Sequence, residues 1–282
     1  MKKQLFAILS LLVLLVLAAC GSDSNEGTSD AGAEEKEEKK EIRFGATTGP
    51  YSDMVTKAIA PLLAEKGYEV KNTEFTDYVQ PNKSLANGDL DANLFQHKIY
   101  LESFAEEHGL ELSEVIIVPT APMGLYSNVF DSVDAIEDGS TIVIANDPTN
   151  LARTLGMLQD EGLITISEEV DPLRASVKDI VENPKGLKFE EIEAGQLPRA
   201  VENEDVAAVP GNYALAADMD LLDALALENM PDDYRNRVAV KTEDLDAQFV
   251  KDIKEVIESD EFEAIIDEQF QGFGKPQWML AE

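Results

Sequence analysis

The feature that most constrains the fold is a regular alternation of short β-like runs with helical segments along most of the chain. The β-like runs alternate in polarity or are wholly apolar, whereas the segments between them repeat apolar residues at helical spacing. In 51–66, three apolar residues recur at every fourth position, namely Met54, Ala58 and Leu62. Gly67 then ends the pattern. Such an alternation predicts an α/β fold.

The expected elements follow from this pattern. We predict strands over 42–46, 68–75, 90–94, 115–118, 123–127, 141–145, 187–192, 206–209 and 238–241. We predict helices over 51–66, 82–86, 99–108, 148–161, 196–202, 245–259 and 261–269. The length suits one large domain or two lobes of about 120 residues each.

The first twenty residues predict an exported lipoprotein. Residues 5–17 are apolar apart from one serine and follow two lysines. This run is shorter than the roughly 20 residues that span a bilayer, and it matches the apolar core of a signal peptide. Leu-Ala-Ala then precedes Cys20, the only cysteine, as in a bacterial lipobox. We predict a removable signal over 1–19 and a lipid on Cys20; the alternative is an ordinary signal followed by an unmodified cysteine.

The segment after the signal has the composition of a tether. Residues 21–41 contain nothing more apolar than alanine, so they cannot bury enough surface to offset their chain entropy. We assign 20–41 to the lipid anchor and a flexible acidic tether with an r.m.s. span of roughly 25 Å. The protein is then expected at the cell membrane, lipid-anchored on the extracytoplasmic face.

The charge of the chain excludes several partners. The formal net charge is −33, and 42–282 hold 48 acidic side chains against 18 lysines and arginines. A field of this sign repels nucleic acid and anionic lipid, so no nucleic-acid partner is expected. We interpret the acidity as a solvated surface suited to salty or alkaline surroundings. His97 and His108 are the only histidines, so we expect neither a zinc site nor a cofactor.

One predicted strand–helix junction has the chemistry of an anion site. The strand ends at Ala145, Asp147 is a good N-cap, and Pro148 suits the first helical position. Asn150 and Arg153 follow three residues apart and therefore share a helix face. A helix N-terminus attracts an anion, and an arginine there can bind a carboxylate with two parallel hydrogen bonds. A well-capped helix with a surface arginine would show the same pattern.

Four other segments combine aromatic, amide or imidazole side chains near predicted strand ends. They are 75–82 with Tyr78, 91–100 with Phe95, His97 and Tyr100, 122–127 with Tyr126, and 209–213 with Asn212. Each alone is equally compatible with packing or turn formation.

Taken in order, these segments resemble the methionine-binding lipoproteins of the NlpA/MetQ family over about residues 42–275. The matching phrases are Asp77–Asn82, Gly88–Asn93, Phe95–His97, Asn146–Asn150 with Arg153, Val181–Pro184, and Gln196–Arg199. The resemblance implies a two-lobed, periplasmic-binding-protein-like α/β fold of type II with the ligand cleft between the lobes. We predict lobe 1 over 42–125 plus 238–282, and lobe 2 over 126–237.

The resemblance also implies a function, namely capture of L-methionine and delivery to an ABC importer made of a permease and an ATPase. We expect a monomer that is not an enzyme. By resemblance, Arg153 would bind the α-carboxylate, and Asn212, with Asn150 or Asn146, would hold the amino and carboxylate groups. The side-chain pocket would be lined by Tyr78, Phe95, His97, Tyr100 and Tyr126. Asn93 belongs to a matching phrase and joins the expected site.

Several alternatives stay open. The sequence departs from the family pattern in two places. One is Gly211, just before Asn212, and the other is Pro119, which precedes 122–126. D-methionine, a methionine dipeptide, a methionine analogue and another small amino acid are therefore candidate ligands, since one methylene changes binding by only about 1–3 kcal/mol. An exported enzyme and an adhesin are remote alternatives. Against an enzyme, the chain lacks the sequence motifs of serine and zinc hydrolases. An adhesin would not need Arg153, Asn212 and His97 to converge on one cleft.

Overall fold

The computed structural model describes residues 40–280. The predicted signal, the lipidation site Cys20 and the tether up to residue 39 lie outside these residues. The expected tether extended to Glu41, but Glu41 is the first residue of β1 (Glu41–Thr47) and pairs with Glu69 of the neighbouring strand. No helix among residues 40–280 is long and apolar enough to cross a membrane.

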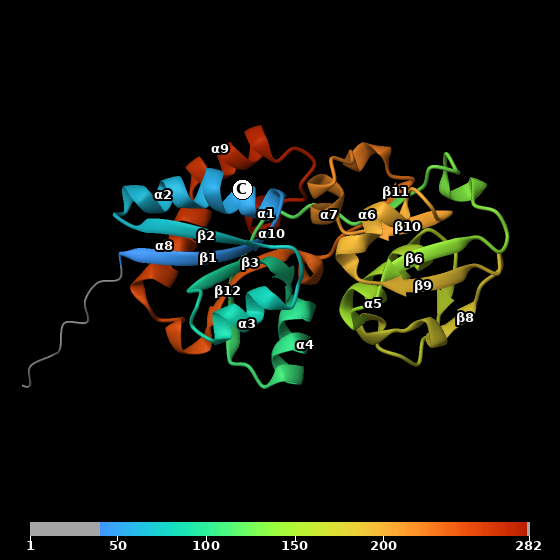
Figure 1. The fold of residues 1–282 in the computed structure, drawn as a ribbon, viewed down its shortest axis with the longest axis horizontal. Helices are drawn as coiled ribbons and strands as arrows, with labels where there is room; N and C mark the ends of the chain where they lie inside the picture. Colours follow the sequence, from blue (N-terminus) through green and yellow to red (C-terminus); the bar gives the residue numbers. More distant parts are fainter. Residues whose placement is uncertain (1–39, 281–282) are drawn as a thin grey trace, which may run out of the picture. The chain divides into compact units, whose positions relative to one another are not determined.

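The first of two five-stranded sheets has the order β2-β1-β3-β12-β4. Its strands are β1, β2 (Glu69–Phe75), β3 (Ala92–His97), β4 (Leu112–Ile117) and β12 (Asn236–Lys241). β1 pairs in parallel with β2 and β3, whereas β12 lies antiparallel between β3 and β4. A strand from the last quarter of the chain is thus inserted among strands from the first half (Figure 1).

Helices cover this sheet and complete the first lobe. They are α1 (Pro50–Asp53), η1 (Met54–Ile59), α2 (Ala60–Glu65), α3 (Gln80–Ala86), α4 (Lys98–His108), α8 (Gln248–Ile257), α9 (Asp260–Gln269) and α10 (Gln277–Leu280). The expected helix over 51–66 is a continuous stretch from α1 to α2 in which η1 has π spacing. Pro61, the second residue of α2, has no N–H for the usual bond to the Lys57 carbonyl, which explains the widened turn before it.

The second sheet has the order β11-β5-β10-β6-β9. Its strands are β5 (Gly124–Tyr126), β6 (Thr141–Ala145), β9 (Lys188–Ile192), β10 (Val206–Val209) and β11 (Ala226–Leu227). The helices of this second lobe are α5 (Pro148–Asp160), α6 (Leu197–Ala200) and α7 (Gly211–Ala216), and a small antiparallel pair is formed by β7 (Thr165–Ile166) and β8 (Ile180–Glu182). α7, β7, β8 and β11 were not predicted, because each is too short to show a periodic pattern.

Two neighbouring segments connect the lobes. The chain crosses from the first sheet to the second through 118–123 and returns through 228–235. The two crossings are joined where the Val118 N–H donates to the Asn236 carbonyl at 2.8 Å and the Asn236 N–H donates to Thr120 Oγ1 at 2.8 Å. The α/β expectation is confirmed. The predicted lobe boundaries stay a prediction, and they fall inside β5 and β12.

Candidate functional site

A pocket lies between the two lobes and is lined by side chains from both. Its lining residues are Tyr51, Tyr78, Phe95, Gln96, His97, Tyr100, Thr120, Ala121, Asn150, Arg153, Pro210, Gly211, Asn212 and Asn236. Half of these residues are site residues predicted from the sequence, namely Tyr78, Phe95, His97, Tyr100, Asn150, Arg153 and Asn212. The structure therefore brings together residues from 75–100, 150–153 and 210–212, which are far apart in the chain.

The first lobe contributes an aromatic cluster of Tyr78, Phe95 and Tyr100. The ring centroid of Tyr78 lies 5.8 Å from the ring centroids of both Phe95 and Tyr100. The ring centroids of Phe95 and Tyr100 lie 6.0 Å apart. The Tyr100 hydroxyl donates to the Tyr78 carbonyl at 3.0 Å, which holds the two residues together. Such a surface suits an apolar or polarisable group, because aromatic rings attract sulfur as well as hydrocarbon.

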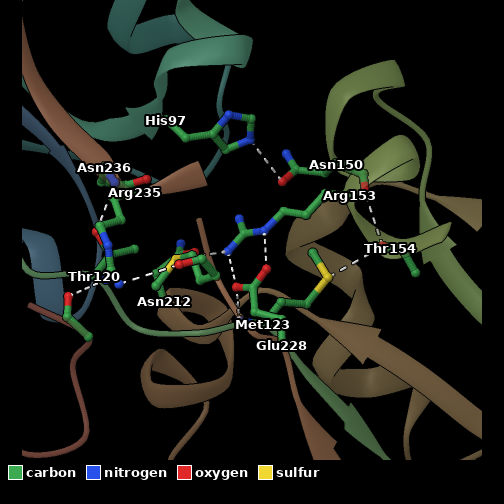
Figure 2. Close-up of polar contacts among 12 residues, drawn as sticks. His97, Thr120, Met123, Asn150, Arg153, Thr154, Asn212, Glu228, Arg235 and Asn236 are labelled. Atoms are coloured by element: carbon green, nitrogen blue, oxygen red, sulfur yellow. Dashed lines mark hydrogen bonds and ion pairs between the residues drawn. The ribbon is translucent and has the colours of Figure 1, made fainter. Parts of the chain in front are cut away.

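His97 connects the aromatic cluster to the second lobe. It is the N-cap of α4, and its Nδ1 accepts the Tyr100 N–H at 3.1 Å. Nε2 therefore carries the proton of the neutral ring and donates to Asn150 Oδ1 at 3.3 Å. Burial, and then the positive charge of Arg153, hold the pKa of His97 well below its usual range. His97 is thus a neutral hydrogen-bond donor across the cleft (Figure 2).

The start of α5 is occupied by its own cap. Asp147 Oδ1 accepts the Asn150 N–H at 2.9 Å, and both Asp147 oxygens accept Asn150 Nδ2 at 3.1 Å. The Asp147 carboxylate is therefore the anion at this helix N-terminus, where the sequence predicts an anion site. Binding of an anionic ligand group consequently depends on Arg153, one turn further along.

Arg153 is buried and is held by residues of the return crossing. Its Nε donates to Glu228 Oε2 at 2.7 Å, and its Nη2 donates to Glu228 Oε1. The guanidinium carbon lies 5.4 Å from the centroid of the Tyr234 ring. Burial acts to lower the pKa of Arg153, but the charge and hydrogen bonds of Glu228 outweigh it, so the pKa is raised. Within residues 40–280, Nη1 makes no hydrogen bond.

Asn212 supplies a second donor without a protein partner. Its Oδ1 accepts the Tyr78 hydroxyl at 2.8 Å across the cleft. Its Nδ2 is buried and has no hydrogen-bond partner among the described residues. A buried unpaired donor costs about 1–3 kcal/mol, so a ligand that accepts its hydrogen bond gains from it. Asn212 and Arg153 thus both offer N–H groups to the pocket.

Three of the predicted site residues do not line this pocket. Asn93 lies in a buried amide network in which its Nδ2 donates to Asn82 Oδ1 at 2.9 Å. Asn146 is exposed at the end of β6. Tyr126 lines a separate surface hollow of the second lobe, where burial and then the carboxylate of Asp220 raise its pKa to about 12.

The residues that the sequence analysis missed come mainly from the two crossings and from α1. They are Tyr51, Gln96, Thr120, Glu228, Tyr234 and Asn236. Gln96 lies inside the family phrase Phe95–His97, and Tyr234 and Asn236 lie just before the predicted strand at 238, so these three had a positional signal in the sequence. No group of three or more His, Cys, Asp or Glu side chains within 40–280 is arranged to hold a metal ion.

Comparison with known proteins decides the family. The family model for NlpA lipoproteins matches residues 42–278. This chain belongs to the NlpA lipoprotein family. The Bacillus subtilis protein named methionine-binding lipoprotein MetQ is 35% identical over 279 residues, covering 96% of this chain and 97% of that protein. The Escherichia coli K12 protein named D-methionine-binding lipoprotein MetQ is 33% identical, covering 98% of each.

A solved structure gives the same result for the fold. A nutrient-binding protein from Burkholderia cenocepacia bound to methionine is 39% identical, with a TM-score of 0.78, and covers 82% of this chain and 97% of that one. The predicted membership of the NlpA/MetQ family and the predicted two-lobed binding-protein fold are confirmed.

Gly211 is required by the close approach of α7 to the first crossing. A Cβ at Gly211 would lie 2.3 Å from the Pro122 carbonyl oxygen and 2.7 Å from Ala121 Cβ. Gly211→Ala should therefore lower the free energy of unfolding by about 1–3 kcal/mol, as overpacking does. Gly156→Ala is the matched control, because a Cβ there meets nothing within 4 Å and raises helix propensity. Urea unfolding of both variants measures this, and equal stabilities would contradict it.

The neutral state of His97 should appear in the pH dependence of stability. Its pKa is lowered in the folded protein, so below about pH 6.5 the unfolded chain binds a proton that the folded chain does not. The free energy of unfolding should then fall as the pH decreases from 6.5 to 5. We expect His97→Gln to reduce this slope by up to about 1.4 kcal/mol per pH unit. Identical slopes for the two proteins would show that His97 titrates freely when folded.

Proposed function

We propose that this chain binds methionine in the pocket between its lobes and delivers it to an ABC importer. The observation that carries the proposal is that one pocket combines an aromatic cluster with two donors, Arg153 Nη1 and Asn212 Nδ2, that have no hydrogen-bond partner among residues 40–280. The donors suit an α-carboxylate, and the rings of Tyr78, Phe95 and Tyr100 suit a thioether. The names of the relatives from B. subtilis and E. coli, and the methionine-bound structure from B. cenocepacia, support the same ligand.

L-methionine is our proposed enantiomer, and D-methionine is the main alternative. The names of the relatives include both methionine-binding and D-methionine-binding lipoproteins. A carboxylate and a thioether are common to both enantiomers, so the donors and the aromatic cluster can serve either. We propose that Asn150 and Asn236, which line the same pocket, hold the ammonium group.

Opening and closing of the lobes would control access to the ligand. Tyr78 from the first lobe bonds Asn212 from the second, and His97 bonds Asn150. These contacts must separate if the lobes open around the two crossings, and they re-form on closure. Ligand binding would therefore stabilise the closed arrangement.

We further propose that the protein acts as a lipid-anchored monomer on the extracytoplasmic face of the cell membrane. The lipobox at Cys20 and the lipoprotein family support the anchor. The tether would keep the binding domain at a high effective concentration near the permease and ATPase subunits. The relatives are named as binding proteins, and we propose no catalytic activity for this chain.

Titration calorimetry tests the proposal. The full-length protein, purified in detergent and refolded to remove bound ligand, should release or absorb heat with L-methionine or D-methionine. Arg153→Lys keeps a cation beside Glu228 but loses Nη1, so it should weaken binding by about 1.5–3 kcal/mol, or roughly 10-fold to 150-fold. Arg199→Lys, on the exposed face of α6, is the matched control. The absence of binding to both enantiomers by the unmodified protein would overturn the proposal.

A further inference from the structure

The charges of the buried ion pair at the pocket cancel. Arg153 is the only formally charged residue among those that line the pocket in the described part of the chain. Its partner Glu228 lies directly behind it, and the two side chains are each 6% exposed. His97 adds no charge, because its hydrogen bonds are those of a neutral ring. The buried Arg153–Glu228 pair therefore contributes one positive and one negative charge to the site.

Glu228 also determines which part of the guanidinium faces the ligand. It accepts from Nε and Nη2 and leaves Nη1 free (Figure 2). The carboxylate of Glu228 is itself fixed, because Oε1 accepts the Met123 N–H at 2.6 Å and the Glu228 N–H donates to the Met123 carbonyl at 3.0 Å. Glu228 therefore cannot swing away when a ligand carboxylate approaches Arg153 without breaking the connection between the two crossings.

A ligand carboxylate must then share Arg153 with a carboxylate that is already present. An anion that carries no compensating charge would leave the buried site with a net charge of about −1, and burying an uncompensated charge is costly. A zwitterion brings its own ammonium group and leaves the site neutral. Removal of the Glu228 charge would reverse this preference, because Arg153 alone would favour an anion.

We propose that Glu228 is a specificity-determining residue that restricts the pocket to net-neutral, zwitterionic amino acids and rejects carboxylates that lack an α-ammonium group. This inference rests on the proposed function and extends it from the ligand's side chain to its charge. Glu228 acts through Arg153 and through the field in the pocket, so it is a positioning residue and a counter-charge for the guanidinium. A purely structural role would change the affinity for all ligands by the same factor.

The test compares L-methionine with 4-(methylsulfanyl)butanoate, which keeps the carboxylate and the thioether but lacks the ammonium group. Calorimetry on the full-length protein gives the ratio of the two dissociation constants. We expect Glu228→Gln to shift this ratio towards the anion by about 10-fold to 100-fold. This range corresponds to unit charges roughly 12 to 6 Å apart at an effective dielectric constant of about 20. Glu228→Asp keeps the charge and should keep the ratio of the unmodified protein, even if both affinities fall.

Glu114→Gln is the matched control, because it neutralises the partner of another buried arginine, Arg237, outside the pocket lining. Its ratio should equal that of the unmodified protein. If the Glu228→Gln variant binds methionine but has the same ratio of dissociation constants as the unmodified protein, the inference is overturned and the proposed function stays intact. If Glu228→Gln does not fold, the unmodified protein decides: binding of 4-(methylsulfanyl)butanoate as tightly as methionine overturns the inference. Failure to bind methionine at all would contradict the proposed function itself.

Discussion

The buried ion pair between Arg153 and Glu228 is the interaction on which the rest of the site depends. A buried pair of this kind is not a strong source of stability, because the loss of hydration offsets the attraction between the charges. Its value here is positional. The pair joins α5 to the return crossing, and Glu228 in turn holds Met123 at the end of the first crossing. The arginine is thereby fixed to the segments around which the lobes would move.

Contacts across the cleft extend from this pair to the first lobe. The centroid of the Tyr234 ring lies 5.4 Å from the Arg153 guanidinium carbon and 5.2 Å from the centroid of the His97 ring. His97 then reaches Asn150, and Tyr78 reaches Asn212. All the residues in these contacts line the pocket except Tyr234, which contacts two lining residues, Arg153 and His97. A ligand in the pocket therefore touches the same side chains that hold the lobes together, so that binding and closure are physically coupled.

The sequence was most informative where local patterns determine the structure. The strand–helix junction at 145–153 was predicted because a strand end, an N-cap and a helical spacing occur within nine residues. The resemblance to a family then joined segments whose proximity no local pattern reveals. The expected helix over 51–66 formed, but the π spacing of η1 arises from Pro61 and the packing around it, which periodicity does not report.

The rest of the site depends on tertiary contacts. Glu228 is one of 56 acidic residues, and nothing in its neighbours distinguishes it before the return crossing is placed beside α5. Asn236 faces the pocket only because β12 inserts between β3 and β4. Conversely, two predicted site residues lie at strand ends but do not reach the pocket. Tyr126 is the last residue of β5, and the strand register turns its side chain to another face. Asn146 follows β6 and is exposed to solvent.

A crystal structure of the protein with L-methionine tests the central claim most directly. The account predicts the α-carboxylate on Arg153 Nη1 and Asn212 Nδ2, the thioether against Tyr78, Phe95 and Tyr100, and Glu228 still bonded to Arg153 Nε. Methionine bound outside this pocket, or bound in it with no contact between its carboxylate and Arg153, would contradict the account.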